Sequence, residues 1–181
     1  RDRAIQQYTK DNKFAPNPVI TAPLEYDTSF LTIAINLVPI VSFATLNDVC
    51  SNSDSLVLAG YAMPVGGVYS GLGVSAGVFI PSTGLLGNNM IIYNYTDSIG
   101  CSDVATQNIT VNASPFASSV TTNATCYGFA DGSALLTISG GTPSYAIDWG
   151  ISNPNALSAG VYSYTVTDLN LCIFSDSVII Y

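Results

Sequence analysis

The sequence predicts an all-β protein made of tandem β-sandwich modules of the Ig-like or PKD-like kind. Three observations predict this class: short apolar runs that alternate with polar residues, clusters of Gly, Pro, Asn and Asp between those runs, and an internal repeat. Turn residues at intervals of about ten residues are typical of a sandwich. After residue 14, no segment has the hydrophobic period of an amphipathic helix.

The internal repeat sets the expected module boundaries. The segment IAINLVP, which begins at Ile33, matches ITVNASP, which begins at Ile109, in its β-branched apolar residues, its Asn and its Pro. The two starts lie 76 residues apart. We therefore expect one Ig-like module over residues 39–114, here called the first module, and a related second module over residues 115–181.

Residues 1–38 are expected to form the C-terminal portion of a preceding module, together with an N-terminal segment. The closing strand of that portion is predicted at roughly Phe30 to Leu37, where apolar and polar residues alternate. Residues 1–14 have weak helical character and no clear apolar face, so they are predicted to be a short helix or a loop.

The strand pattern is clearest in the second module. The runs that begin at Ala134 and at Tyr162 place apolar or aromatic side chains at every second position, which predicts strands with one face toward a core. Trp149 is the single Trp, and it comes later in its module than the Trp of an antibody-type domain. It is predicted to pack in the core or to line a groove.

Charge excludes several classes of partner. The net charge is −8, and all four Lys and Arg residues lie within the first thirteen residues. Nucleic acids and anionic membranes require clustered cations, so neither is an expected partner. The uncharged runs from Thr28 to Asn47 and from Ser55 to Thr96 are interrupted by Pro and Gly, so membrane insertion is not expected either.

The four cysteines predict disulfides, two in each module. Cys50 and Cys126 lie near the starts of their modules, and Cys101 and Cys172 lie near the ends. The repeat favours pairing within each module, Cys50 with Cys101 and Cys126 with Cys172. No two cysteines have the close spacing of a zinc site, so no metal or other cofactor is expected. Disulfides indicate an oxidising compartment.

Asp97 and Asp168 each precede the last Cys of their module by four residues. Calcium at the module junctions is one interpretation, and a carboxylate that caps its own turn is the other. The acidic residues of the chain are scattered, whereas calcium sites need several carboxylates close together. The sequence therefore favours capping.

Sequence strings in both modules carry a resemblance to a known family. The second module contains CYGFADGS from Cys126, GGTPSYAIDW from Gly140 and LSAGVYSYTVTDLNLC from Leu157. These strings resemble the SprB repeat of very large cell-surface adhesins of Bacteroidota, the gliding bacteria. Leu171 is a departure, since that family usually has Gly before the Cys.

The first module carries GGVYSGLGV from Gly66, FIP from Phe79 and YNYTDSIGC from Tyr93. It is similar to the Ig-like modules that lie beside SprB repeats. The resemblance implies an extracellular cell-surface protein exported by type IX secretion, used as a fibre in adhesion or gliding motility. Its partners would be neighbouring modules, and it implies no catalysis.

Two other functions stay open from the sequence. The chain has no His, and no Lys follows residue 13, so a Ser nucleophile would lack its usual base. A carboxylate pair for glycoside cleavage is the weaker of the two, since Glu25 is the only Glu in the chain. The stronger alternative is a module that binds carbohydrate or another surface polymer through exposed aromatic side chains. Its candidates are Tyr61, Tyr69, Tyr127 and Tyr145.

Three serines are candidate sites of O-glycosylation, which would make the chain a glycoprotein. The resemblance implies the O-glycosylation pattern of Bacteroidota, which is an Asp followed by Ser or Thr and then by an apolar residue. Ser55, Ser98 and Ser177 match this pattern.

Overall fold

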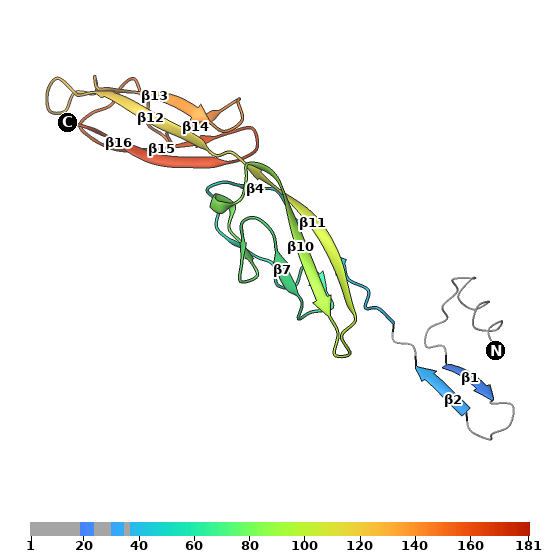
Figure 1. Cartoon of the computed structure of the whole chain (residues 1–181). Helices are drawn as coiled ribbons and strands as arrows, with labels where there is room; N and C mark the ends of the chain where they lie inside the picture. The colour runs from blue at the N-terminus through green and yellow to red at the C-terminus, as the bar shows by residue number, and fades with distance from the viewer. Residues whose placement is uncertain (1–18, 24–29, 35–36) are drawn as a thin grey trace.

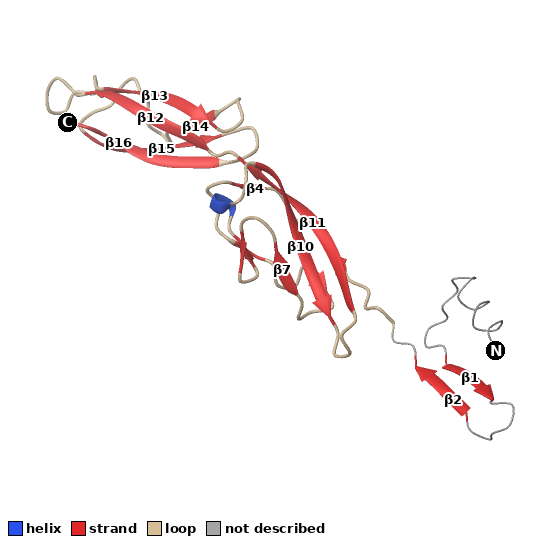
Figure 2. Ribbon diagram, in the orientation of Figure 1, coloured by secondary structure: helices blue, strands red, loops and turns tan. Residues whose placement is uncertain are grey.

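The computed structural model describes residues 19–23, 30–34 and 37–181. Nearly all regular structure in this part is β-strand, and the short 3₁₀ helix Pro81–Thr83 is the exception (Figure 2). The predicted all-β sandwich class is thereby confirmed.

The N-terminal described strands form an antiparallel hairpin. β1 (Val19–Pro23) pairs with β2 (Phe30–Ala34). β2 covers the first part of the strand predicted from Phe30 to Leu37. The expected helix or loop over residues 1–14 lies outside the described residues.

The first module is organised around one long hairpin (Figure 1). β10 (Gly87–Thr96) and β11 (Ser102–Asn112) are antiparallel and form the centre of a four-stranded sheet. β7 (Val68–Ser70) extends this sheet beside β10, and β4 (Val49–Cys50) pairs in parallel with the last residues of β11. The β4 pairing places Cys50 beside the C-terminal end of the hairpin.

Short strands accompany this sheet. They are β3 (Ser42–Phe43) paired with β6 (Ala62–Met63), and β9 (Val78–Phe79) between β5 (Leu56–Val57) and β8 (Val74–Ser75). One buried cluster forms the core of the module, and it comprises Leu58, Phe79, Ile91, Ile109 and Val111. Each such side chain stabilises the fold by about 1.5–3 kcal/mol relative to an exposed position.

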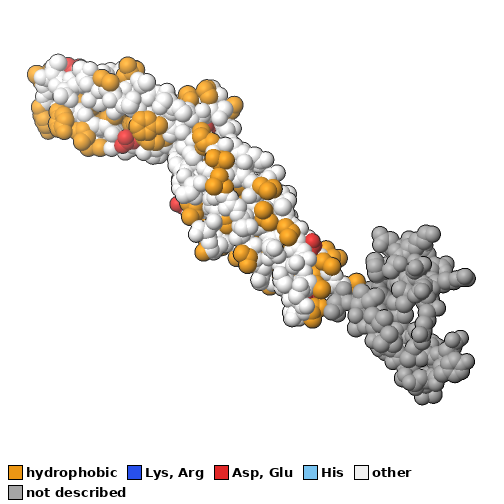
Figure 3. Space-filling view, viewed as in Figure 1, with side chains coloured by type: hydrophobic (Ala, Val, Ile, Leu, Met, Phe, Trp, Pro, Cys, Tyr) orange, Lys and Arg blue, Asp and Glu red, His pale blue; other side chains and the backbone are white. Residues whose placement is uncertain are grey.

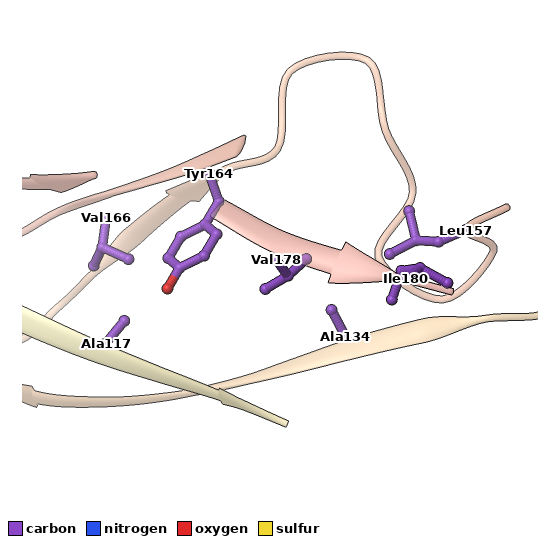
Figure 4. Close-up of a cluster of buried hydrophobic side chains, with 7 residues drawn as sticks. All are labelled: Ala117, Ala134, Leu157, Tyr164, Val166, Val178 and Ile180. Carbon is purple, nitrogen blue, oxygen red and sulfur yellow. The ribbon is translucent and has the colours of Figure 1, made fainter. Parts of the chain in front are cut away.

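The second module has two sheets with a core between them. β12 (Pro115–Thr122) pairs with β13 (Ser133–Gly140), and β15 (Gly160–Thr167) lies between β14 (Ala146–Asp148) and β16 (Ile173–Ile180). Figure 4 shows small side chains of the first sheet opposite large ones of the second. The buried cluster comprises Ala117, Ala134, Leu157, Tyr164, Val166, Val178 and Ile180.

The predicted alternation is confirmed in this core. Ala134 of β13 is buried, whereas Leu135 is 71% exposed. In β15, Tyr164 and Val166 are buried, whereas Ser163 is exposed and Thr165 is only half-buried. The period of two therefore identified the inward face of both strands correctly.

The two buried clusters lie on opposite sides of the predicted boundary after residue 114. Within the described residues, no strand pairing joins the two modules. They follow each other in an elongated arrangement (Figure 1). The boundaries themselves remain predictions. In Figure 3, the visible face of the described part shows carboxylates among apolar and neutral side chains.

Candidate functional site

The connection between the two modules is short and is closed by a disulfide. β11 ends at Asn112 and β12 begins at Pro115. Cys50 of the first module is bonded to Cys172 of the second, with a Cα–Cα distance of 5.6 Å. Cys172 is fully buried, so the bond lies within the packed junction.

The expected pairing of cysteines within each module is wrong. Cys50 lies opposite Asn112, the last residue of β11, whereas Cys101 comes just before the first residue of that strand. The eleven residues of β11 span about 35 Å. A disulfide requires Cα atoms within about 7 Å, so Cys50 and Cys101 cannot meet. Cys101 and Cys126 are free thiols in the structure.

Polar side chains join the modules beside the disulfide. The Asn52 side chain donates from Nδ2 to the Ile173 carbonyl at 2.8 Å, across the junction. Asn52 Oδ1 also accepts from the Ser114 hydroxyl at 2.6 Å, and Ser114 N–H donates to Ser51 Oγ at 3.1 Å. These bonds fix the linker against the loop after Cys50.

The turn that carries Cys172 is held by a buried carboxylate. Asp168 is only 3% exposed. Its Oδ1 accepts from Cys172 N–H and its Oδ2 accepts from Thr142 N–H, each at 2.8 Å. Asn170 in the same turn donates from Nδ2 to Asn112 Oδ1 at 3.1 Å, which ties the turn to the end of the first module. The carboxylate therefore positions the second half of the disulfide.

Asp97 caps the equivalent turn of the first module. Its Oδ1 accepts from Ile99 N–H at 3.0 Å and from Cys101 N–H at 2.9 Å. Hydrogen bonds to backbone N–H groups thus support the capping interpretation for both Asp97 and Asp168. Among the described residues, no group of three or more metal-binding side chains comes together.

The turn at Leu171 has the left-handed backbone conformation that the glycine of the family pattern would adopt, although Leu replaces Gly there. Leu171 has φ of 64°, a conformation that favours glycine, and Gly100 at the equivalent position has φ of 91°. The turn geometry is therefore retained, but a leucine adopts the left-handed conformation. The Leu171 side chain is 77% exposed and gains little by burial.

A shallow pocket of about 400 Å³ lies on the second module. Trp149 lines it, as do Tyr162 and Tyr164, and the Trp149 and Tyr164 ring centroids are 5.0 Å apart. Trp149 is half-buried and packs against the core, which agrees with its predicted place at a core or groove. Burial raises the pKa of the Tyr164 hydroxyl, and the negative charge of Asp176 adds to this.

The aromatic residues suggested by the sequence do not gather in this pocket. Tyr127 is fully exposed in the loop between β12 and β13. Tyr61, Tyr69 and Tyr145 are half-buried, and none of them lines the pocket. Tyr69 packs beside Tyr93 in the first module, with ring centroids 4.6 Å apart, and burial raises its pKa.

The three candidate glycosylation serines are all exposed. Ser55 lies just before β5, Ser98 lies in the β10–β11 turn, and Ser177 lies in β16. They are accessible to a modifying enzyme, and their glycosylation stays a prediction.

Sequence reasoning missed the polar residues of the junction. Asn52, Ser114 and Asn170 contribute hydrogen bonds there. One clue was present, because Asn112 is the Asn that recurs in the repeat match with Asn36. The other residues are common turn formers, and nothing in the sequence distinguishes them from solvated loop residues.

The described part of the chain is thus an all-β protein whose sandwich modules are joined end to end by a disulfide. Residues 118–150 match the family model of the SprB repeat. The chain accordingly resembles the SprB repeats of Bacteroidota adhesins. A comparison with curated proteins gave no match.

The SprB repeat is a structural family found in cell-surface proteins. The match indicates a repeat region of the kind associated with cell-surface adhesins. Within the described residues, no helix has the length and apolar character needed to cross a bilayer.

Proposed function

We propose that this chain is a non-catalytic, structural spacer within an extracellular adhesin or filament, exported by type IX secretion and used in adhesion or gliding. The observation that carries the proposal is the Cys50–Cys172 bond between successive modules. A spacer must hold its modules in line under tension, and a covalent bond across the junction serves this purpose.

The position of the disulfide determines which part of the chain can extend. The two cysteines are 122 residues apart in sequence. When force acts on the chain ends, the covalent path passes directly from Cys50 to Cys172. The intervening polypeptide, which includes most of both cores, is thereby shielded from extension.

The hydrogen bonds at the junction support the same function. Asn52 reaches Ile173 across the boundary, and Asn170 reaches Asn112 from the other side. Contacts on both sides of the linker restrict bending at the short connection between β11 and β12. The expected partners are accordingly the neighbouring modules of the same fibre.

Single-molecule pulling from the two termini tests the spacer. In the oxidised chain, the segment between Cys50 and Cys172 is expected to add nothing to the measured contour length. The double variant Cys50→Ala/Cys172→Ala should release roughly 400 Å of additional contour, because each extended residue spans about 3.3–3.6 Å. Cys101→Ala/Cys126→Ala is the matched control and should behave as the parent chain. Equal extension of the parent and the first variant would contradict the spacer proposal.

Display at the cell surface has a separate test. Antibodies against residues 39–181 should label intact cells of the source organism, and mild surface proteolysis with chymotrypsin should remove that labelling. Labelling that requires permeabilised cells would overturn the extracellular assignment.

A second candidate function is binding of a surface polysaccharide at the Trp149 pocket. Sugar-binding sites commonly use aromatic rings beside polar groups, and Asp148 and Ser163 line the pocket with Trp149. A glycan array decides between the two functions. Saturable binding that Trp149→Ala abolishes and Tyr127→Ala leaves intact would favour this second function, and silence of the parent chain would favour the spacer.

A further inference from the structure

The two free cysteines correspond, one each, to the two bonded cysteines. Cys101 N–H donates to Asp97 Oδ1 at 2.9 Å, and Cys172 N–H donates to Asp168 Oδ1 at 2.8 Å. In each turn the Asp N–H donates back to the carbonyl of the same Cys, at 2.9 Å and 3.0 Å respectively. Cys101 is therefore the first-module counterpart of Cys172.

Cys126 is the counterpart of Cys50 by its place in the repeat. Each follows, at the same interval, the Pro with which its module begins. Each also lies near the end of the last strand of its module. Ser51 N–H donates to the carbonyl of Asn112, which ends β11, at 2.8 Å, and Ala124 N–H donates to the carbonyl of Tyr181, which follows β16, at 3.1 Å. The bond between Cys50 and Cys172 thus joins two parts that face each other at the junction. One is the loop after Cys50, here called the exit loop, at the end of the first module that faces the second. The other is the turn from Asp168 to Cys172, here called the entry turn, at the end of the second module that faces the first.

We propose that Cys50–Cys172 is one member of a repeating series of inter-module disulfides, and that Cys101 and Cys126 are half-sites of the next members. Cys126 forms a disulfide with the counterpart of Cys172 in a following module. Cys101 forms a disulfide with the counterpart of Cys50 in a preceding module. The partner in each case is another module of this kind, so the inference deepens the proposed spacer function and rests on it.

The free cysteines lie at opposite ends of the two-module unit. Cys101 precedes the start of β11, and the tip of the β10–β11 hairpin points away from the second module (Figure 1). Cys126 lies in the loop between β12 and β13, and Ala124 N–H in that loop donates to the Tyr181 carbonyl. This loop lies at the end of the second module that is remote from the first (Figure 1). β11 spans about 35 Å, and the second module continues away from its far end (Figure 1), so the two thiols cannot pair within one chain.

The loop that carries Cys126 exposes large aromatic side chains that a neighbouring module would bury. Tyr127 is 100% exposed and Phe129 is 59% exposed, although both are large aromatic residues that follow Cys126 closely in sequence. The loop is nevertheless ordered by hydrogen bonds, since Asp131 accepts from both the N–H and the hydroxyl of Thr125. These hydrogen bonds lower the pKa of Asp131 and so favour its charged form.

The first module shows what covers such a loop. There, Asn52 follows Cys50 closely and donates to the Ile173 carbonyl beside Cys172. The entry turn of the second module thus seats against the exit loop of the first. The entry turn of a following module, with its own Cys, fits the exposed loop at Cys126 in the same way.

Bond formation needs an oxidant, and a small disulfide such as oxidised glutathione is of the required class. One protein thiolate attacks the glutathione disulfide and releases one glutathione thiolate. The second protein thiolate then attacks the mixed disulfide, which forms the inter-module S–S bond and releases the second glutathione. The two protons lost by the cysteines end on the two glutathione thiols, so atoms and electrons balance.

The full chain itself provides the probe, because a second copy offers both half-sites. Oxidised glutathione should convert the parent chain into multimers that dithiothreitol disperses. The variants Cys101→Ala and Cys126→Ala should each stay mainly monomeric alone and should form dimers when mixed. Chymotryptic mapping of the dimer should then identify a peptide that links Cys126 of one copy to Cys101 of the other.

Two outcomes would overturn the inference. The first is a mixture that remains monomeric while the thiols are oxidised to mixed disulfides with glutathione. The second is a symmetric dimer, Cys101 to Cys101 or Cys126 to Cys126, that forms as fast as the mixed dimer. Neither outcome affects the pulling experiment on Cys50–Cys172, so failure of this inference is distinguishable from failure of the spacer function.

Discussion

Asp168 accepts a hydrogen bond from Thr142 N–H at 2.8 Å, and this bond joins the turn before β16 to the loop after β13. The same carboxylate accepts from Cys172 N–H. One buried side chain thus positions the cysteine that is bonded to the neighbouring module. The stability of the turn and the geometry of the junction therefore depend on the same residue.

We expect Asp168→Ala to lower the free energy of unfolding by about 1–3 kcal/mol, because it leaves the N–H groups of Thr142 and Cys172 without their acceptor. Asp168→Asn should lower the free energy of unfolding by less, since the amide carbonyl oxygen still accepts one of these two hydrogen bonds. Denaturant unfolding measures both. Asp97→Ala is the matched control in a more exposed turn, and a loss there as large as at Asp168 would contradict the role of burial.

Leu171→Gly should stabilise the protein by about 0.5–1 kcal/mol. A leucine with φ of 64° is strained by roughly 1–2 kcal/mol, and the greater freedom of glycine in the unfolded chain offsets part of that gain. Thermal unfolding of the variant measures the effect. Gly100→Ala, at the equivalent turn of the first module, should shift stability in the opposite direction. A destabilised Leu171→Gly variant would mean that the exposed leucine makes an unrecognised contact.

Cys50→Ala/Cys172→Ala should separate the unfolding of the two modules. Their cores are distinct, and no strand pairing joins them in the described part of the chain. The chain-entropy model assigns roughly 5 kcal/mol to a disulfide that closes a loop of this length. Differential scanning calorimetry should resolve two transitions in the variant at lower temperature than the parent, and Cys101→Ala/Cys126→Ala should leave the parent profile unchanged.

Stability should fall as the pH rises above about 10, the usual pKa of tyrosine. The pKa of Tyr164 is raised by burial first and by the charge of Asp176 second, so the folded state keeps this phenolic proton when the unfolded state has lost it. Free energy is therefore lost only above the pKa of the unfolded state.

Urea unfolding from pH 8 to pH 11 measures this dependence. Tyr164→Phe should reduce the fall of the unfolding free energy at alkaline pH. Asp176→Asn should reduce it less, because it removes only the negative charge that adds to the effect of burial on the pKa of Tyr164. An unchanged slope in Tyr164→Phe would show that other tyrosines account for the decline.

The sequence alone determined the class of the fold and the positions that repeat. Period-two alternation depends only on neighbouring residues, so it located the inward faces of β13 and β15. The Asp that precedes each late Cys by four residues is also a local feature, and the capping of both turns could be anticipated from it.

Only the tertiary structure decided how the cysteines pair. The repeat established that Cys50 corresponds to Cys126 and that Cys101 corresponds to Cys172, but it carried no information on where in space each cysteine lies within its folded module. The length of β11 separates Cys50 from Cys101, and the short linker after Asn112 brings Cys172 to Cys50. Pairing depends on distance in space, and that distance is set by strand length and by the stacking of modules, neither of which a repeat in sequence specifies.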